Sequence, residues 1–380
     1  MEFWSSVELG GFLRGAIREL RATGLDVSHR FEVDESDYRF ARSAAARARL
    51  RWRSYVTYPR HLRRHLRAET APGVAVVCTN TFYAPAVAVR AARRLGLRVV
   101  NWVFDLFPDV LVESGKIAAG GLWDHRLGRL AWATFRAADA NVFLGERLKS
   151  YATTRYGEIP NALVIPVGAD GEAFRSCPPQ SRRAREPVRI LYCGNLGRMH
   201  DTQTIADLLG ESSPSGWTLE FRGHGAGFRQ LASSVASGPS GAAVLFGPGL
   251  PDEAWTEVLK AADVALVTMK HGAEGLVMPS KTYSAMVAGQ AVLAICPRAS
   301  DLADTVFRHD AGWVVEPGDV GHLREVLAGL AARPEEVLQK RRKAFAAAHQ
   351  LYDQRAVAAH WKRLLASLGS GQETRPGGFP

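Results

Sequence analysis

The sequence predicts an α/β protein with two domains, each built around a parallel β-sheet. Short runs rich in Val, Ile and aromatic residues alternate with longer amphipathic stretches, which is the pattern of strand–helix–strand units. A polar, proline-bearing segment, Pro178 to Val188, interrupts this alternation and is typical of a linker. The 380 residues also exceed what one hydrophobic core usually supports. We therefore expect two Rossmann-like domains that face each other across a cleft.

The linker sets the expected domain boundaries. We expect a first domain over residues 1–177, the linker over 178–188 and a second domain over 189–350. Residues 351–368 have a helical pattern, and packing back onto the first domain is one arrangement open to them. Residues 369–380 are rich in Gly and Pro and are expected to form a flexible tail.

The hydrophobic pattern places the individual elements. The expected strands of the first domain are Met1–Ser6, Val27–Val33, Val74–Thr79, Arg98–Phe104, Ala140–Leu144 and Ala162–Pro166. Those of the second domain are Arg189–Cys193, Thr218–Gly223, Ala243–Phe246, Val264–Val267, Ala291–Ala294 and Gly312–Val315. Expected helices include Phe12–Thr23, Ala84–Leu95, Asp201–Leu209, Gly227–Val235, Pro251–Ala261, Lys281–Ala288, Val320–Ala331 and Pro334–Leu351.

Composition indicates an ordinary globular protein of a reducing compartment. The chain is 47% hydrophobic and 23% charged, and its four cysteines form no closely spaced pair. No apolar run is long enough to span a bilayer, and charges interrupt every apolar stretch of the first thirty residues. We expect a cytoplasmic protein, with the inner face of the cell membrane as a second location.

The formal net charge of +10 is concentrated in residues 42–67. This segment is rich in arginine, holds no acidic residue and interleaves Trp52, Tyr55 and Tyr58 with the arginines. An anionic membrane surface is the partner that this pattern favours, because aromatic rings suit the headgroup level. A solvated helical face is the plain alternative, and nucleic acid is a weaker one.

An anion site is predicted where the loop Gly275 to Ser280 passes into a helix. The helix is expected to begin at Lys281, after Met278 and Pro279, with Ser280 as its cap. Free amides at a helix start attract an anion, and Lys281 adds a full positive charge. An ordinary capped helix with an exposed lysine is the alternative.

A second anion-binding element opens the second domain, in the stretch RILYCGNLGRMHD. A strand ends at Cys193, and Gly194 and Asn195 begin a tight loop that a ligand could approach closely. Arg198 offers the planar donor fork that phosphate oxygens require, and Asp201 is expected to cap the next helix. Arg198 and Lys281 together predict a pyrophosphate site.

Two further glycine-bearing loops are expected beside the ligand. In FRGHGAGF, Gly223 and His224 are expected to line the cleft next to a nucleoside base, although the glycine spacing misses the dinucleotide fingerprint. In the first domain, Gly10 and Gly11 precede Phe12 at a helix start, which gives a flexible approach to a ligand. A helix start without any ligand is the alternative there.

One carboxylate of the first domain has the position of a catalytic residue. Asp105 follows an apolar strand and lies among aromatic residues, including Phe107. Such a setting raises the pKa of a carboxyl group and suits it to proton transfer or carbocation stabilisation. The alternative is a turn closed by Pro108. Asp109 and Glu113 are weaker candidates.

These motifs resemble a known family. The stretches that carry the likeness are WVFDLFPD, VIPVGADGEAF, YCGNLGRMHD, LFGPGLPDEAWTEVLKAADVALVTM, MPSKTYSAMVAGQAVLA and AGWVVEPGD. Their order and spacing are similar to those of GT-B-fold glycosyltransferases of family 4, the group 1 glycosyltransferases, and in particular to bacterial polysaccharide-biosynthesis enzymes with a Pro-Ser-Lys motif. The likeness spans nearly the whole chain and is densest from Arg189 to Asp319.

The resemblance implies a retaining hexosyl transfer from a nucleotide-diphosphate sugar, expected to be UDP-linked, to an acceptor hydroxyl. It implies no cofactor and no metal ion, because basic side chains and amides hold the diphosphate. By position, Arg198 and Lys281 would contact the diphosphate, as would the amides of Ser280, Lys281 and Thr282. Gly11 would approach the donor from the first domain, and Asp105 would lie near the transferred sugar. The acceptor, a glycan that could be lipid-linked, is assigned Gly10, Phe12 and Phe107.

The chain departs from the family at two positions. Many members carry two glutamates eight residues apart, which contact the sugar and the nucleotide ribose. Leu276 and Ser284 occupy these positions here. Glu274 could supply a substitute carboxylate for the sugar, or it could be a plain loop residue.

The sequence is therefore compatible with three functions. A sugar transferase of cell-surface polysaccharide or lipid-linked oligosaccharide assembly is favoured. A nucleotide-sugar epimerase of the same fold would act on the donor alone. A degenerate homologue acting as a partner subunit would explain Leu276 and Ser284 and would leave Arg198 and Lys281 unexplained.

Overall fold

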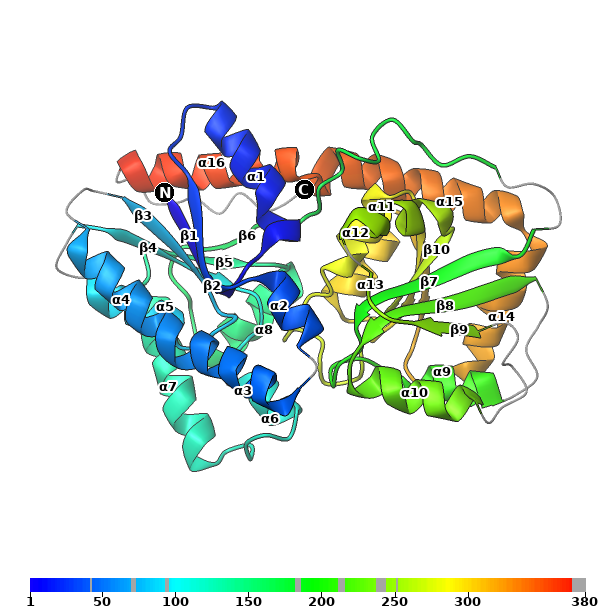
Figure 1. Ribbon diagram of the computed structural model, residues 1–380, viewed down its shortest axis with the longest axis horizontal. Helices are drawn as coiled ribbons and strands as arrows, with labels where there is room; N and C mark the ends of the chain where they lie inside the picture. The colour runs from blue at the N-terminus through cyan, green and yellow to red at the C-terminus, as the bar shows by residue number, and fades with distance from the viewer. Residues whose placement is uncertain are drawn as a thin grey trace. The chain divides into compact units, whose positions relative to one another are not determined.

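Each half of the chain forms a six-stranded parallel β-sheet with helices around it (Figure 1). Unit 1 comprises Met1–Val167, Gly275–Met278 and Gln354–Pro380, and unit 2 comprises Gly168–Glu274 and Pro279–Asp353. The computed structural model describes residues 1–41, 43–69, 73–92, 96–181, 186–210, 216–236, 244–250 and 252–370. Within these ranges, the side chains of residues 12, 38–40, 235, 236, 252, 253 and 370 are not described.

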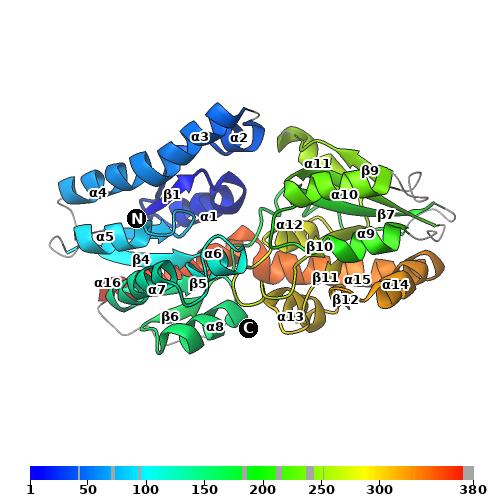
Figure 2. The same cartoon turned by 90° about the horizontal axis from the view of Figure 1, so that it is seen from below.

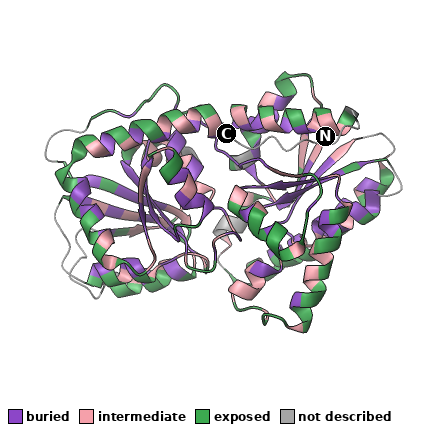
Figure 3. Ribbon diagram, turned by 180° about the vertical axis from the view of Figure 1, so that it is seen from behind, coloured by how far each residue is buried: buried purple, intermediate pink, exposed green. Residues whose placement is uncertain are grey.

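The sheet of unit 1 has the strand order β2-β1-β3-β4-β5-β6. Its strands are β1 (Glu2–Val7), β2 (Ser28–Val33), β3 (Val74–Cys78), β4 (Arg98–Val103), β5 (Ala140–Phe143) and β6 (Ala162–Val164). The central strands β3 to β5 are almost wholly buried and rich in valine, as parallel strands covered on both faces require. Figure 3 shows this burial in the strands of both sheets.

Helices cover both faces of this sheet. They are α1 (Gly10–Ala22), α2 (Glu35–Phe40), α3 (Ala44–Trp52), the π-helical η1 (Arg53–Thr57), α4 (Tyr58–Ala68), α5 (Ala84–Ala92), α6 (Asp109–Glu113), α7 (Leu122–Ala137), α8 (Glu146–Tyr156) and α16 (Gln354–Ser370). Helix α5 packs between α4 and α7, whereas α1 packs against α16 (Figures 1 and 2). The first and last helices of the chain therefore complete the same unit.

The sheet of unit 2 has the order β12-β11-β10-β7-β8-β9. Its strands are β7 (Val188–Asn195), β8 (Trp217–His224), β9 (Val244–Gly247), β10 (Val264–Thr268), β11 (Ala291–Ile295) and β12 (Gly312–Val315). Its helices are α9 (Gln203–Gly210), α10 (Ala226–Ala236), α11 (Asp252–Ala261), α12 (Lys281–Val287), α13 (Asp301–Arg308), α14 (Val320–Ala332), α15 (Pro334–Ala347) and the π-helical η2 (Ala348–Tyr352). A continuous cluster of buried side chains from these strands, α9, α10, α14 and α15 forms its core.

The unit boundaries differ from the predicted ones. The first segment of unit 1 ends at Val167, so residues 168–177 and the predicted linker, residues 178–188, lie within unit 2. The expected final helix of unit 2 passes into η2, and α16 begins only at Gln354, in unit 1. The predicted tail overlaps α16 at Gly369 and Ser370, and residues 371–380 lie outside the described part of the chain, as do 182–185 of the predicted linker.

The arginine-rich segment forms α3, η1 and α4. Trp52 and Tyr55 are exposed, with exposed fractions of 61% and 39%, together with most of the arginines. Tyr58 is 1% exposed and packs with Leu62 and Leu66 in the core of unit 1. The prediction that Tyr58 would face a membrane is therefore wrong, because the apolar stripe of α4 turns its side chain inward. Arg42 lies outside the described residues.

Gln354 holds α16 against α1. Its side chain is 1% exposed, its Oε1 accepts a hydrogen bond from the Ala16 amide at 3.1 Å, and its Nε2 donates one to the Gly11 carbonyl at 2.9 Å. A methyl group on Gly15 would overlap the Gln354 side chain. Glycine at position 15 is therefore required by the close approach of the two helices.

Replacing Gly15 with alanine should lower the free energy of unfolding by about 1–3 kcal/mol, because Gln354 must move and lose buried hydrogen bonds. The matched control is Gly128→Ala in the middle of α7, where the new methyl group would lie 3.8 Å from Tyr156. That change should instead stabilise by about 0.5–1 kcal/mol through helix propensity. Urea unfolding measures both, and equal stability of the two variants would contradict the clamp.

Candidate functional site

Lys281 lies at the carboxyl end of the unit 2 sheet, as the first residue of α12. Its Nζ donates a hydrogen bond to the Tyr192 hydroxyl at 2.6 Å and lies 3.5 Å from the Asn195 carbonyl oxygen. The Tyr192 hydroxyl in turn donates to that carbonyl at 2.9 Å. The ammonium also lies 4.1 Å from the centre of the Tyr192 ring. The lysine is therefore held at the end of β7 and does not project freely into solvent.

Burial lowers the pKa of Lys281 from 10.5 to about 7. No carboxylate of the described residues forms an ion pair with it. An anion placed beside Nζ would favour the charged form and raise this pKa again. The site is therefore suited to take up an anion and a proton together near neutral pH.

A glycine near the end of β7, Gly194, lies beside this lysine. Gly194 has φ +111° and a Cβ there would lie 3.8 Å from Lys281 Nζ. The absence of a side chain at Gly194 thus leaves backbone accessible next to the ammonium. Asn195 is exposed at the end of β7, and Arg198 is exposed in the loop that leads to α9. The structure therefore brings Gly194, Asn195 and Lys281 together as predicted, with Arg198 three residues beyond.

His200 belongs to the same cluster and was not among the predicted site residues. Its Nδ1 lies 2.8 Å from the Thr268 carbonyl oxygen, which can only accept, so Nδ1 carries a proton. Burial, and then the charge of Lys281, lower the pKa of His200 to about 3, which keeps the ring neutral. Tyr192 was also missed, because it looks like a core residue of an apolar strand. Thr268, at the end of β10, could have been found from its strand-end position.

The start of α12 differs from the prediction. Ser280 makes no capping hydrogen bond with its side chain, and the Thr282 amide donates to the Pro279 carbonyl at 3.1 Å. Ser280 as a cap and the Thr282 amide as a free donor are therefore wrong, because the tight turn after Pro279 satisfies that amide internally. The helix is also short, seven residues, which limits its dipole. The Thr282 hydroxyl is buried and has no hydrogen-bond partner among the described residues.

The other predicted donor residues are more scattered. Gly223 has a structural reason to be glycine, because a Cβ there would overlap the backbone of Gly194 across the β7–β8 pairing. His224 is exposed at the end of β8, and Ser284 is half-buried in α12. Met278 is 7% exposed and belongs to unit 1, as does Leu276, whose carbonyl accepts from the Leu106 amide at 3.0 Å.

Glu274 is half-buried, and its Oε2 is buried without a hydrogen-bond partner among the described residues. A buried acceptor of this kind is costly unless something satisfies it. The observation distinguishes Glu274 from an ordinary solvated loop residue. Asp201 accepts hydrogen bonds from the Gln203 and Thr204 amides, the arrangement of a cap for α9, although its Oδ2 is also buried without a partner among the described residues.

In unit 1, Asp105 follows β4 and lines a small cavity of about 30 Å³ together with Thr79, Phe82 and Phe107. The Thr79 hydroxyl fixes its backbone by accepting from the Phe104 amide at 3.0 Å and donating to the Asp105 carbonyl at 3.1 Å. Burial raises the pKa of Asp105 from 3.8 to about 6. Its carboxyl group makes no hydrogen bond or ion pair with the described residues.

The remaining predicted residues of unit 1 surround the start of α1. Gly10 is buried as the first residue of α1, and Gly11 is exposed with open space where a side chain would be. The side chain of Phe12 lies outside what the structure describes. Asp109, a weaker candidate, is held by Arg155 and Tyr156 and has a structural role.

The described residues include neither a metal-binding cluster nor a membrane-spanning helix. No group of three or more His, Cys, Asp or Glu side chains within those ranges is arranged to hold a metal ion. None of the helices in the same part of the chain is both long and apolar enough to cross a membrane.

The chain has the GT-B fold, two Rossmann-like units with parallel sheets, as the sequence predicted. It is similar to the sucrose-phosphate synthase of Thermosynechococcus elongatus, with a TM-score of 0.75, 16% identity and coverage of 98% of this chain and 100% of that one. It is also similar to HepE of Anabaena in complex with UDP, with a TM-score of 0.70, 14% identity and coverage of 96% and 99%.

A relative by sequence is the probable glycosyltransferase WbjE of Pseudomonas aeruginosa, 26% identical over 266 residues. The match covers 65% of this chain and 65% of the relative's length. No protein-family model matches the chain. These likenesses confirm the resemblance to GT-B-fold glycosyltransferases that the sequence motifs indicated.

The raised pKa of Asp105 predicts a stability change for Asp105→Asn. A carboxyl group whose pKa rises on folding binds its proton more tightly in the folded state, so ionisation between about pH 4 and pH 6 destabilises the protein. The variant should therefore be more stable than the natural protein by about 1–3 kcal/mol at pH 8 and similar to it at pH 4.

Melting temperatures and urea unfolding across this pH range measure the difference. The matched control is Asp34→Asn, which changes an exposed carboxyl group and should alter stability by less than about 0.5 kcal/mol at either pH. A constant difference between Asp105→Asn and the natural protein from pH 4 to pH 8 would show that Asp105 is not desolvated.

Proposed function

We propose that the protein is a glycosyltransferase that moves a hexose from a nucleotide-diphosphate sugar to an acceptor hydroxyl in polysaccharide or lipid-linked oligosaccharide assembly. The observation that carries the proposal is the half-buried Lys281, with its ammonium beside Tyr192 and next to the open backbone at Gly194. The similarity to a probable glycosyltransferase supports it. Because HepE was solved with UDP and with UDP-glucose, we propose a UDP-linked donor.

Lys281 would stabilise the diphosphate as it departs. Negative charge develops on the leaving diphosphate when its bond to the sugar breaks, and a cation already held in place stabilises that charge without reorganisation. Arg198, exposed three residues beyond Asn195, would supply a second set of donors. With these groups in place, we propose that the transfer needs no metal ion and, as the resemblance implies, retains the anomeric configuration.

Glu274 would replace one of the missing glutamates. Its buried Oε2 lacks a partner, and a sugar hydroxyl is the kind of donor that would satisfy it. Ser284 is too short to reach as far as a glutamate, so we propose that the ribose contact is weaker or is made by another residue. Asp105, with a pKa of about 6, would exchange a proton readily near neutral pH.

The donor proposal predicts how UDP and uridine bind. Lys281→Ala should weaken UDP binding roughly 10- to 100-fold, the loss of one charge-assisted hydrogen bond with its ion pair, and should leave uridine binding unchanged. Arg198→Ala should act in the same direction. Titration calorimetry at pH 8 in buffers of different ionisation enthalpy should also reveal proton uptake with UDP, because Lys281, with a pKa of about 7, is mostly neutral before binding.

The matched control is Lys362→Ala, which removes an exposed lysine of α16 and should change neither affinity nor proton uptake. Equal UDP affinity in the natural protein and the Lys281 variant, or proton uptake that survives the substitution, would contradict the diphosphate assignment. A sugar product with inverted anomeric configuration, read from its proton coupling constant, would contradict retention alone.

We also propose that α3, η1 and α4 bring the protein to an anionic membrane surface. The exposed Trp52 and the arginines around it support this, since each arginine near such a surface contributes about 1 kcal/mol. Arg49→Gln combined with Arg51→Gln should then reduce co-sedimentation with phosphatidylglycerol-containing vesicles roughly 30-fold.

The control for this experiment is Arg229→Gln with Arg342→Gln, two exposed arginines of unit 2, which should sediment like the natural protein. If both double variants lose binding equally, the attraction follows net charge alone. That result, or no sedimentation of the natural protein, would remove the proposed surface.

A further inference from the structure

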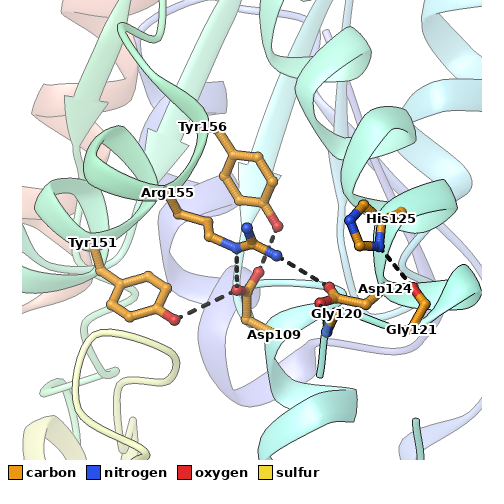
Figure 4. Close-up of polar contacts among 8 residues, drawn as sticks. All are labelled: Asp109, Gly120, Gly121, Asp124, His125, Tyr151, Arg155 and Tyr156. Atoms are coloured by element: carbon orange, nitrogen blue, oxygen red, sulfur yellow. Dashed lines mark hydrogen bonds and ion pairs between the residues drawn. The ribbon is translucent and has the colours of Figure 1, made fainter. Parts of the chain in front are cut away.

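A groove of unit 1 takes no part in the site described above. It lies between one face of α7 and the end of α8 and has a volume of about 540 Å³, within the range of small-molecule sites (Figure 4). The residues that line it are aromatic, charged or glycine, and none is aliphatic. The cavity at Asp105 is lined by other residues, although α7 contributes to both.

Gly128 keeps this groove open. It lies in the middle of α7, where glycine is less favourable than alanine by about one kcal/mol or less. Packing does not require it, because a Cβ at this position would make only an ordinary contact, 3.8 Å, with the Tyr156 ring. Gly120, Asp124 and Trp132 lie at four-residue intervals from it and line the groove as well. A longer side chain at 128 would project into the space between them.

Ion pairs and hydrogen bonds to two buried carboxylates fix the polar wall of the groove. Arg155 donates from NH2 to Asp124 at 3.1 Å and from Nε to Asp109 at 3.2 Å, and the Tyr156 hydroxyl donates to Asp109 at 2.5 Å (Figure 4). Asp109 and Asp124 are 6% and 5% exposed. The wall is therefore ordered before any ligand arrives, which reduces the entropy lost on binding.

Three side chains at the groove are exposed and could contact a ligand: His125, Trp132 and Arg129. The Nδ1 of His125 donates to the Gly121 carbonyl at 2.9 Å, so Nε2 is the acceptor of the neutral ring and has no partner among the described residues. Trp132 is 48% exposed, and Arg136 lies 5.4 Å from its ring centre. Arg129 is exposed and forms no ion pair with the described residues.

We propose that this groove binds a pyranose unit of a glycan. The apolar face of a sugar ring packs against an aromatic side chain such as Trp132, and its hydroxyls pair with fixed acceptors and donors such as Asp124, His125 and Arg155. A phosphate group fits poorly, because the Asp124 carboxylate already occupies the start of α7, accepting from the Gly120 amide at 2.9 Å. Arg129 would favour a sugar with an acidic substituent.

The biological occupant would be the acceptor chain, and that identification rests on the proposed function. Saccharide binding by the groove does not rest on the proposed function, so either hypothesis can fail while the other stands. The groove lies in unit 1, apart from the Lys281 cluster of unit 2 in the chain's division into units. A sugar-binding groove on unit 1 would let the protein select acceptors by the sugars that they carry.

Saturation-transfer NMR with methyl glycosides tests the proposal. The probes are the methyl glycosides of glucose, galactose, mannose, N-acetylglucosamine and glucuronic acid. At least one should show saturation transfer with the natural protein. Gly128→Leu should abolish the signal by filling the groove, and Trp132→Ala should weaken binding roughly three- to tenfold through loss of the aromatic contact.

Matched controls lie on the same helix. Ala133→Leu and Trp123→Ala alter exposed residues of α7 that do not line the groove, and both should bind like the natural protein. Circular dichroism and the melting temperature report the folding of each variant, and Trp132→Ala keeps the test decisive if Gly128→Leu fails to fold.

Two outcomes would overturn the proposal. The first is that no glycoside shows a signal that depends on Gly128 or Trp132. The second is that Trp132→Ala and Trp123→Ala both lose binding to anionic lipid vesicles while no glycoside binds, which would make α7 a membrane-facing helix. Unchanged UDP binding in the Lys281 variant together with glycoside binding that depends on Gly128 and Trp132 would contradict the diphosphate assignment and support the groove.

Discussion

The hydrogen bond from the Lys281 ammonium to the Tyr192 hydroxyl is the interaction on which the site in unit 2 depends. Lys281 must begin α12 at the carboxyl end of the sheet, and Tyr192 must pair its hydroxyl with the Asn195 carbonyl. The Gly194 turn then leaves backbone open beside the charge. A desolvated cation with no carboxylate partner is unfavourable by itself, and an incoming diphosphate would relieve that cost. Diphosphate binding and proton uptake by Lys281 are therefore coupled.

Two carboxyl groups of unit 1, Asp105 in the loop after β4 and Asp109 at the start of α6, illustrate how partners decide the role of an acidic side chain. Asp109 accepts hydrogen bonds from Arg155 and Tyr156 and is part of an ordered network. Asp105, four residues earlier, has burial without a partner, and its pKa rises to about 6. A satisfied carboxylate orders its surroundings, whereas an unsatisfied one is available for chemistry at the expense of stability. The first supports the groove on α7 and the second lines the cavity at the end of β4.

The sequence was sufficient for the fold because strand and helix periodicity alternate along the whole chain, and the GT-B prediction is confirmed. The proximity of Gly194 and Lys281 was also predictable. Gly194 lies at the end of β7, Lys281 begins the helix that follows β10, and these two strands are neighbours in the sheet. Tyr192 was not, because a hydroxyl inside an apolar strand gives no pattern of its own. The prediction that Ser280 caps α12 was wrong for a local reason, because the tight turn after Pro279 satisfies the Thr282 amide internally. The groove joins Asp109, Asp124 and Arg155 from three helices, and no local spacing links them.

A crystal structure of the full chain with UDP bound tests the central claim most directly. The account predicts diphosphate oxygens within hydrogen-bonding distance of Lys281 Nζ and next to the backbone of Gly194. It also predicts that the ammonium turns from the Tyr192 hydroxyl toward the phosphate. A diphosphate bound elsewhere, with Lys281 still directed only at Tyr192 and Asn195, would contradict it.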